Sequence, residues 1–143
     1  MGHPNLAHLR EGNRRLTPQR RLVWEILHHS SDHLTAEQLH TEAKAQLPDL
    51  SQPTVYRILT ALVDAHHVRE IAIPHGPSRY ETICADDPHS DLVCNRCGRI
   101  EKVHDEVLVR TARSAMAGHD FQPDELHLVL YGTCGCCTTA TSG

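Results

Sequence analysis

The stretch SQPTVYRILTALV, residues 51–63, decides the fold of the first half of this 143-residue chain. It opens with a serine that can cap a helix, and its apolar residues then recur at positions i, i+3, i+4, i+7 and i+8, which form one face of an α-helix. These residues are Val55, Ile58, Leu59, Leu62 and Val63. The opposite face is polar, so we expect a helix that packs on one side and is free to contact a ligand on the other.

The sequences on either side of this helix predict a winged helix-turn-helix. Upstream, Thr17-Pro18 and the capping box Thr35–Gln38 each begin a helix. Downstream, residues 68–73 and 78–83 have the composition of strands, and the turn 74–77 separates them. Three helices followed by a hairpin are the elements of a winged helix.

The second half predicts a small α/β domain, which makes the fold class α+β. Residues 85–88 are acidic and end in proline, so we expect a hinge linker there, between a domain at 1–84 and a second at 89–137. Beyond it we expect strands near 91–94, 100–103 and 126–131, a helix near 106–117 and a disordered tail at 138–143. The apolar residues predicted to face inward from that helix are Val107, Leu108, Ala112 and Ala115.

Composition indicates a soluble protein of the cytoplasm. No apolar run approaches the ~20 residues that span a bilayer, and the first residues lack the basic and apolar regions of a secretory signal. The net charge of −4 hides an asymmetry, because residues 1–30 carry five arginines against two glutamates whereas residues 81–143 carry five basic against ten acidic side chains. A basic front end on an acidic protein suggests contact with phosphate, although solvated charge explains the counts equally well.

Four of the six cysteines form two CxxC pairs, Cys94/Cys97 and Cys134/Cys137. In a reducing cytoplasm such pairs bind metal more readily than they form disulfides. Four thiolates around one ion are the closed tetrahedral shell of structural Zn²⁺. The alternative is a pair of redox dithiols, and Cys136 is left over.

The polar face of residues 51–63 predicts a DNA-reading surface. One helix fits the major groove, where residues near its N-terminal end reach base edges and basic residues hold phosphates. The candidate DNA-binding residues are Gln52, Thr54, Tyr56 and Arg57. Some winged helices contact proteins instead, but the basic front end favours DNA.

The thirteen histidines need mostly ordinary explanations, such as surface positions and helix ends. His89-Ser-Asp91 is different, because alternation along a strand puts His89 and Asp91 on one face just before the first CxxC pair. An imidazole and a carboxylate could bind Fe²⁺, Mn²⁺ or Zn²⁺ if further ligands came from the other domain. Spacing alone leaves a chance surface pair as the alternative.

Taken together, these residues resemble the ferric uptake regulator (Fur) family of bacterial metal-sensing repressors. The resemblance covers about residues 9–137 and rests on LTPQR (16–20), HLTAE (33–37), TVYR (54–57), RYE (79–81), the HxD-LxC run (89–94) and YGTC (131–134). It implies a homodimer, joined through the second domain, that binds an inverted-repeat operator in double-stranded DNA. It also implies a structural zinc and a second, regulatory divalent metal at the hinge.

Carried over residue by residue, the resemblance implies regulatory ligands at His33, Glu81, His89 and Asp91. Metal bound from both sides of a hinge would stabilise only the conformation in which both domains supply ligands. Arg15 resembles a position that contacts the minor groove.

The sequence also departs from the family pattern. Many members have histidine where Asp91 stands and an acidic ligand where Lys102 aligns, so His104, two residues further on, is a possible replacement. Cys84 lies near a thiolate used by zinc-sensing relatives and is a further possible ligand. A second His-rich site of some members is absent, because Pro88 and Ser90 interrupt that run.

Three alternatives to metal-dependent repression stay open. Some members that the chain resembles sense peroxide, through iron that oxidises a ligand histidine. An enzyme is a different class: His104-Asp-Glu106 with the second CxxC pair loosely resembles zinc deaminases, but that chemistry needs an open zinc position rather than four thiolates. We therefore expect no enzymatic activity. The third alternative is a zinc-stabilised interaction module without sensing.

Overall fold

The structure, a computed structural model, describes residues 17–84, 87–123 and 126–140. Arg15 and residues 85–86 of the expected linker lie outside the described residues. The chain forms two compact units, one of residues up to Ile73 together with Pro77–Ile83, and one of Pro74–Gly76 together with residues from Cys84 onward. No described helix is long and apolar enough to cross a membrane.

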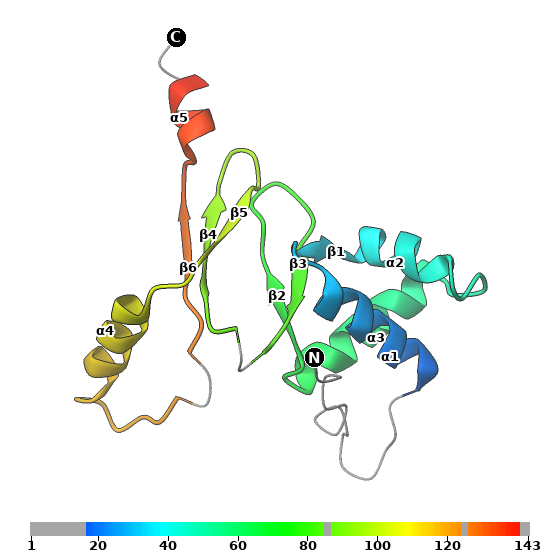
Figure 1. Cartoon of the computed structure of the whole chain (residues 1–143), viewed down its shortest axis with the longest axis horizontal. Helices are drawn as coiled ribbons and strands as arrows, with labels where there is room; N and C mark the ends of the chain where they lie inside the picture. Colours follow the sequence, from blue (N-terminus) through cyan, green and yellow to red (C-terminus); the bar gives the residue numbers. More distant parts are fainter. Residues whose placement is uncertain (1–16, 85–86, 124–125, 141–143) are drawn as a thin grey trace. The chain divides into compact units, whose positions relative to one another are not determined.

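Unit 1 contains three helices whose starts are fixed by local capping (Figure 1). They are α1 (Pro18–His29), α2 (Ala36–Lys44) and α3 (Gln52–Asp64). Thr17 caps α1 by accepting a hydrogen bond from the Arg20 amide, and Thr35 and Gln38 form the predicted capping box. The apolar face predicted for residues 51–63 packs in the core, where Val55, Ile58, Leu59 and Leu62 are buried.

A three-stranded antiparallel sheet completes unit 1. The strands are β1 (Leu34–Thr35), β2 (Val68–Ile71) and β3 (Arg79–Thr82), in the order β1-β3-β2. The hairpin of β2 and β3 follows α3 directly, so unit 1 is a winged helix-turn-helix, as predicted. The short strand β1 was not predicted, because two residues are too few to show alternation.

Unit 2 contains a sheet in which its first strand pairs with its last. The strands are β4 (Ser90–Cys94), β5 (Ile100–Val103) and β6 (Val129–Gly132), and β4 lies between the other two. It pairs antiparallel with β5 and parallel with β6, with Cys94 opposite Gly132. This register brings the residues after the first strand next to those after the last. The α+β fold class is confirmed.

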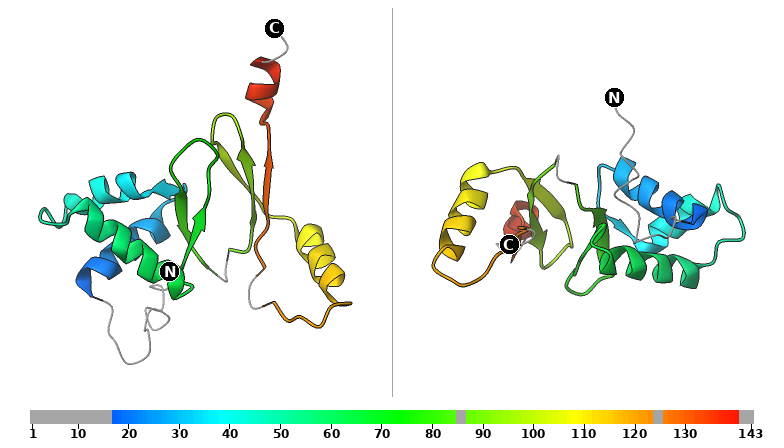
Figure 2. Two further views of the ribbon diagram at one scale, coloured as in Figure 1. Left: turned by 180° about the vertical axis from the view of Figure 1, so that it is seen from behind. Right: turned by 90° about the horizontal axis from the view of Figure 1, so that it is seen from below.

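Two predictions for unit 2 need correction. Helix α4 (Glu106–Met116) forms as expected, but none of its residues is buried, and the supposedly inward Val107 is 67% exposed. Figure 2 shows α4 at the periphery of the unit, with no described element on its outer side. The predicted disordered tail is wrong for residues 138–140, because helix α5 (Gly135–Ala140) continues through them, with the Thr138 amide donating to the Cys134 carbonyl at 2.9 Å.

Candidate metal centres and nucleic-acid interface

The four predicted zinc ligands come together in unit 2. Cys94 ends β4, Cys97 lies in the turn after it, Cys134 follows β6 and Cys137 lies in α5. One sulfur from each lies within 4.8 Å of the other three, and the Sγ atoms of Cys97 and Cys134 are 3.7 Å apart. Four sulfurs at about 2.3 Å from a tetrahedral ion would be roughly 3.8 Å from one another. The cluster therefore has the donor set and the dimensions of a structural zinc site.

Hydrogen bonds from backbone amides stabilise a thiolate in this cluster. The Sγ of Cys94 accepts hydrogen bonds from the amides of Cys134, at 3.3 Å, and Arg96, at 3.4 Å. Backbone hydrogen bonds, from Cys134 first, then Cys97 and to a smaller extent Arg96, lower the pKa of Cys94 to about 5. A hydrogen bond with Cys134 and burial raise the pKa of Cys137 to about 12. Without a cation the four groups cannot all ionise, so a metal ion is what completes the thiolate shell.

The four predicted regulatory ligands form two pairs, one in each unit. In unit 1, His33 precedes β1 and Glu81 lies in β3, and the His33 Nε2 and Glu81 Oε2 atoms are 2.6 Å apart. Both side chains are buried. Buried imidazoles and carboxylates are rare without a partner or an ion. Unit 1 thus brings together an imidazole and a carboxylate that could both bind a divalent ion.

Arg69 is a neighbour of this pair that sequence reasoning missed. It stands directly opposite Glu81 in the β2–β3 ladder, and its Nη1 donates to Glu81 Oε1 at 2.8 Å. Glu81 therefore directs one oxygen to a guanidinium and the other to His33. Strand alternation could have placed Arg69 beside position 81, but only with the register of the hairpin known.

In unit 2, His89 and Asp91 also come together. The Nε2 of His89 is 3.5 Å from Asp91 Oδ1, and Asp91 has 0% of its side chain exposed. The other carboxylate oxygen, Oδ2, accepts a hydrogen bond from His127 Nε2 at 2.7 Å. His127, 9% exposed, was not singled out from the sequence. It reaches Asp91 because β6 runs parallel to β4, with the Asp91 amide donating to the Leu128 carbonyl.

A second cluster in unit 2 surrounds the other nitrogen of His89. The Nδ1 atom is 2.9 Å from the Asp87 carbonyl, and the Asp87 carboxylate binds His104 Nε2 at 2.8 Å. Asp87, His89 and His104 can each direct one ligand atom to a common space within 4.8 Å. The His104 hydrogen bond is the main cause that lowers the pKa of Asp87. His104, a possible ligand in the sequence analysis, thus lies beside His89, whereas Cys84 belongs to no cluster among the described residues.

The predicted DNA-reading residues lie on the first turns of α3. Gln52, Tyr56 and Arg57 are exposed and Thr54 is half-buried. The Nη2 of Arg57 donates to Thr54 Oγ1 at 3.1 Å, and Tyr56 is 46% exposed. These side chains therefore form a polar surface at the N-terminal end of the second helix of a helix-turn-helix, where base edges are contacted in the major groove.

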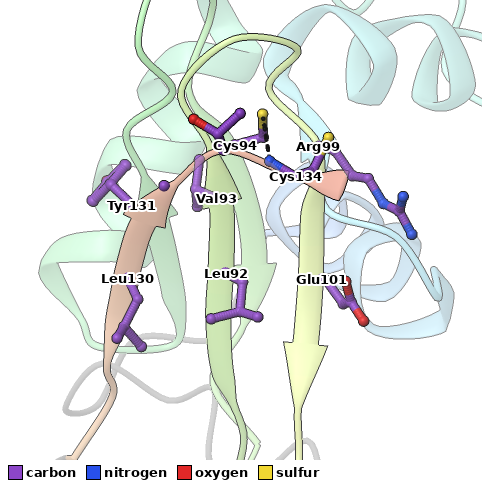
Figure 3. Close-up of a pocket in the computed structure, with 10 residues that line it drawn as sticks. Leu92, Val93, Cys94, Arg99, Glu101, Leu130, Tyr131 and Cys134 are labelled. Carbon is purple, nitrogen blue, oxygen red and sulfur yellow. Dashed lines mark hydrogen bonds between the residues drawn. The ribbon is translucent and has the colours of Figure 1, made fainter. Parts of the chain in front are cut away.

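Unit 2 carries an uncovered apolar surface. Large exposed apolar side chains lie on β4, β6, α4 and the segment after it: Leu92, Val107, Met116, Phe121, Leu130 and Tyr131. Leu92 and Leu130 lie on neighbouring strands, where the wall of a depression of about 190 Å³ runs from β6 across β4 to β5 (Figure 3). Exposed apolar side chains gathered on neighbouring strands, such as Leu92 and Leu130, are typical of surfaces that pack against a partner.

These features define a class of protein, a winged-helix DNA-binding domain joined to a zinc-dependent domain. The chain matches the family model "Ferric uptake regulator family" over residues 11–131, and it belongs to that family. It is a transcriptional regulator, as the sequence predicted.

Individual relatives have names that refer to iron or to peroxide. The chain is 35% identical over 132 residues to the ferric uptake regulation protein of Campylobacter jejuni, covering 90% of this chain and 83% of the relative. It is 29% identical to the peroxide operon regulator of Bacillus subtilis, covering 93% and 90%. Among solved structures, the C. jejuni peroxide stress regulator has a TM-score of 0.72 at 28% identity, over 84% of this chain and 89% of that one. Both kinds of signal are thus found among similar proteins.

Proposed function

We propose that this protein is a homodimeric, metal-dependent repressor that acts on operator DNA in the cytoplasm. One observation supports the proposal: each unit holds a buried imidazole–carboxylate pair, which would supply half of the ligands of a divalent metal ion. The four regulatory ligands would be His33, Glu81, His89 and Asp91. Two imidazoles and two carboxylates form a donor set that suits Fe²⁺, Mn²⁺ or Zn²⁺.

Because the ligands are divided between two units, binding of the metal ion would change how freely the units move relative to each other. An ion bound by both pairs holds the units in one arrangement, and losing it releases them. Such an ion shifts the conformational equilibrium by its difference in affinity between the joined and separated states. Since each subunit carries one α3, fixing the units fixes the spacing of two recognition helices, which must match the half-sites of an inverted repeat.

Zinc and the apolar surface of unit 2 would stabilise the dimer whether or not the regulatory metal is bound. Four thiolates leave no open position for exchange, and Zn²⁺ in that shell would tie β4 to β6 and α5. The uncovered face of α4 and β6 would pack against the same face of a second copy, which is the usual isologous arrangement of a dimer. DNA contact falls to Gln52, Thr54, Tyr56, Arg57 and, by family resemblance, Arg15.

The donor set bears on the identity of the signal. The proposed ligands include no thiolate, and Cys84 joins none of the described clusters. Oxygen and nitrogen donors without sulfur suit iron and manganese as well as zinc, so the donor set leaves all three ions as candidates. Iron in this position also keeps peroxide sensing as a second candidate, through oxidation of His33 or His89.

Operator binding by the zinc-loaded dimer tests the proposal. The protein is freed of exchangeable metal and then titrated with Fe²⁺, Mn²⁺ or Zn²⁺ without oxygen, and binding to an inverted-repeat operator is measured by fluorescence anisotropy. Wild type should bind at least tenfold more tightly with the correct metal. His89→Ala should keep zinc and dimer but lose this stimulation, whereas His119→Ala, an exposed histidine outside the clusters, should keep it.

The outcomes separate the candidates. If His89→Ala is stimulated as strongly as wild type, His89 is not a regulatory ligand. If wild type binds DNA equally with and without metal, the protein is not a metal-dependent repressor. Peroxide added to the iron-loaded form distinguishes the second candidate, because only a peroxide sensor should lose DNA binding and gain a mass of 16 Da on a ligand histidine.

A further inference from the structure

His89 stands between two groups of ligands that approach its two ring nitrogens. On the Nε2 side lies Asp91, with Oδ1 at 3.5 Å. On the Nδ1 side lies Asp87, with its carbonyl at 2.9 Å and its carboxylate Oδ2 at 3.7 Å. His104 adds a second imidazole on this side, with its ring centre 5.9 Å from that of His89. Each nitrogen of one buried ring thus faces potential ligands.

We propose that Asp87, His89 and His104 form a second divalent-cation site, contained within unit 2. Two imidazoles and one carboxylate are a common three-ligand set for Zn²⁺, Fe²⁺ and Co²⁺, with water in the open positions. An ion about 2.1 Å from each donor requires donors no more than about 4.2 Å apart. The three residues already lie within 4.8 Å, so small side-chain rotations would close the site.

The surroundings of this set suit an exchangeable ion rather than a structural one. The side chains of Asp87 and His104 are 48% and 56% exposed, so an ion can reach them from solvent. Lys102 Nζ lies 4.0 Å from Asp87 Oδ2 and supplies a cation to the carboxylate. A divalent ion would replace this weak ion pair, which costs little because both partners remain hydrated.

The shared imidazole makes the two sites mutually exclusive. A neutral imidazole has one N–H and one lone pair, so it can bind metal at only one nitrogen. With the proton on Nδ1, that N–H donates to the Asp87 carbonyl and Nε2 is the ligand on the Asp91 side. With the proton on Nε2, the N–H faces Asp91 and Nδ1 is the ligand on the Asp87 and His104 side. The tautomer of His89 would therefore select the site.

The site formed by Asp87, His89 and His104 would bind a metal ion before the regulatory site does. Its ligands all come from unit 2, so it is complete whatever the position of unit 1. The proposed regulatory set needs both units. This role, but not the site itself, rests on the function proposed above.

Cobalt binding to the full-length, zinc-containing dimer tests the site. Co²⁺ is titrated without oxygen, and its visible absorption and the number of ions bound per chain are measured. Wild type should bind one Co²⁺ per chain beyond the zinc. His33→Ala, which removes a ligand in unit 1, should still bind one Co²⁺, with a changed spectrum. His33→Ala/His104→Ala should bind it at least tenfold more weakly, and the matched control His33→Ala/His119→Ala should behave as His33→Ala.

Each contrary result overturns a stated part of the inference. If His33→Ala binds no Co²⁺, or if adding His104→Ala changes nothing, Asp87, His89 and His104 form only a hydrogen-bonded cluster. If wild type binds two ions beyond the zinc, the sites do not exclude one another. These readouts require no DNA, so they stay interpretable if metal fails to stimulate operator binding, which would refute the proposed function alone.

Discussion

Arg69 and Glu81 face each other across the hairpin of unit 1, with the guanidinium Nη1 2.8 Å from the carboxylate Oε1. Both side chains are largely withdrawn from solvent. A fixed positive charge therefore lies beside one of the proposed regulatory ligands. It holds the carboxylate in place, and it also repels any divalent ion that the carboxylate binds.

Repulsion should dominate over positioning, because the strand and His33 already orient Glu81. A charge and a dication a few ångströms apart still interact by about 1–2 kcal/mol when well screened. Arg69→Gln should therefore tighten binding of Mn²⁺ about tenfold, measured by calorimetry on the zinc-loaded dimer. Lys44→Gln, which removes a charge at the exposed end of α2, is the control. Weaker binding by Arg69→Gln would show instead that Arg69 acts by positioning Glu81.

His127 should act on metal binding through Asp91. Its hydrogen bond holds a carboxylate that is fully buried, and groups that orient metal ligands typically change affinity by about 10–100-fold when removed. We expect His127→Ala to weaken Mn²⁺ binding within this range while zinc content stays at one per chain. His127→Gln, whose amide can donate to the same oxygen, should recover part of the loss. Equal affinities in all three proteins would contradict the role.

The cysteine cluster gives a prediction with an internal control. Cys94→Ser removes the thiol that the backbone amides hold most strongly, so the protein should lose its zinc and unfold at a lower temperature. Cys136→Ser changes an exposed thiol outside the cluster and should change neither. Zinc content by mass spectrometry and thermal unfolding by circular dichroism measure both effects. Zinc retained at one per chain in Cys94→Ser would count against a four-cysteine site.

The apolar face of unit 2 predicts a dimer that a single charge disrupts. Leu130, 46% exposed on β6, would be buried against a second copy. Leu130→Glu places two carboxylates in one two-fold interface, so the dimer should dissociate at least a hundredfold more readily. Analytical ultracentrifugation over a range of concentrations measures this change. Thr41→Glu, on an exposed position of α2, should leave the dimer intact, and an unchanged Leu130→Glu dimer would place the interface elsewhere.

Arg57 should contribute charge to DNA binding. It is exposed on α3, and its guanidinium is oriented by Thr54. Arg57→Ala should weaken operator binding by about 1–3 kcal/mol and reduce selectivity if Arg57 contacts a guanine. If it contacts a phosphate, binding should weaken equally on all sequences, with a salt slope smaller by about one. Lys44→Ala is the control, and operator binding unchanged in Arg57→Ala would remove this residue from the interface.

The sequence by itself determined the elements and the donor sets. The helix starts at Thr17, Thr35 and Ser51 depend on hydrogen bonds to residues three positions away, and the CxxC spacing keeps two thiols within one turn. These interactions are local, so the printed residues suffice to predict them. The pairing of His33 with Glu81 was reached only through family resemblance, because the two residues lie 48 positions apart in the chain.

Only the tertiary structure decided which residues meet across the sheets and what stays uncovered. Alternation shows which side chains share a face of a strand, but it does not show which strands become neighbours. The parallel pairing of β6 with β4 brings His127 within hydrogen-bond distance of Asp91. The register of the hairpin does the same for Arg69 and Glu81. Burial of a side chain likewise depends on the surface that packs against it, and the sequence of one helix does not specify that surface. The periodicity of α4 predicted an apolar face, but the described residues of one chain supply no surface to bury it.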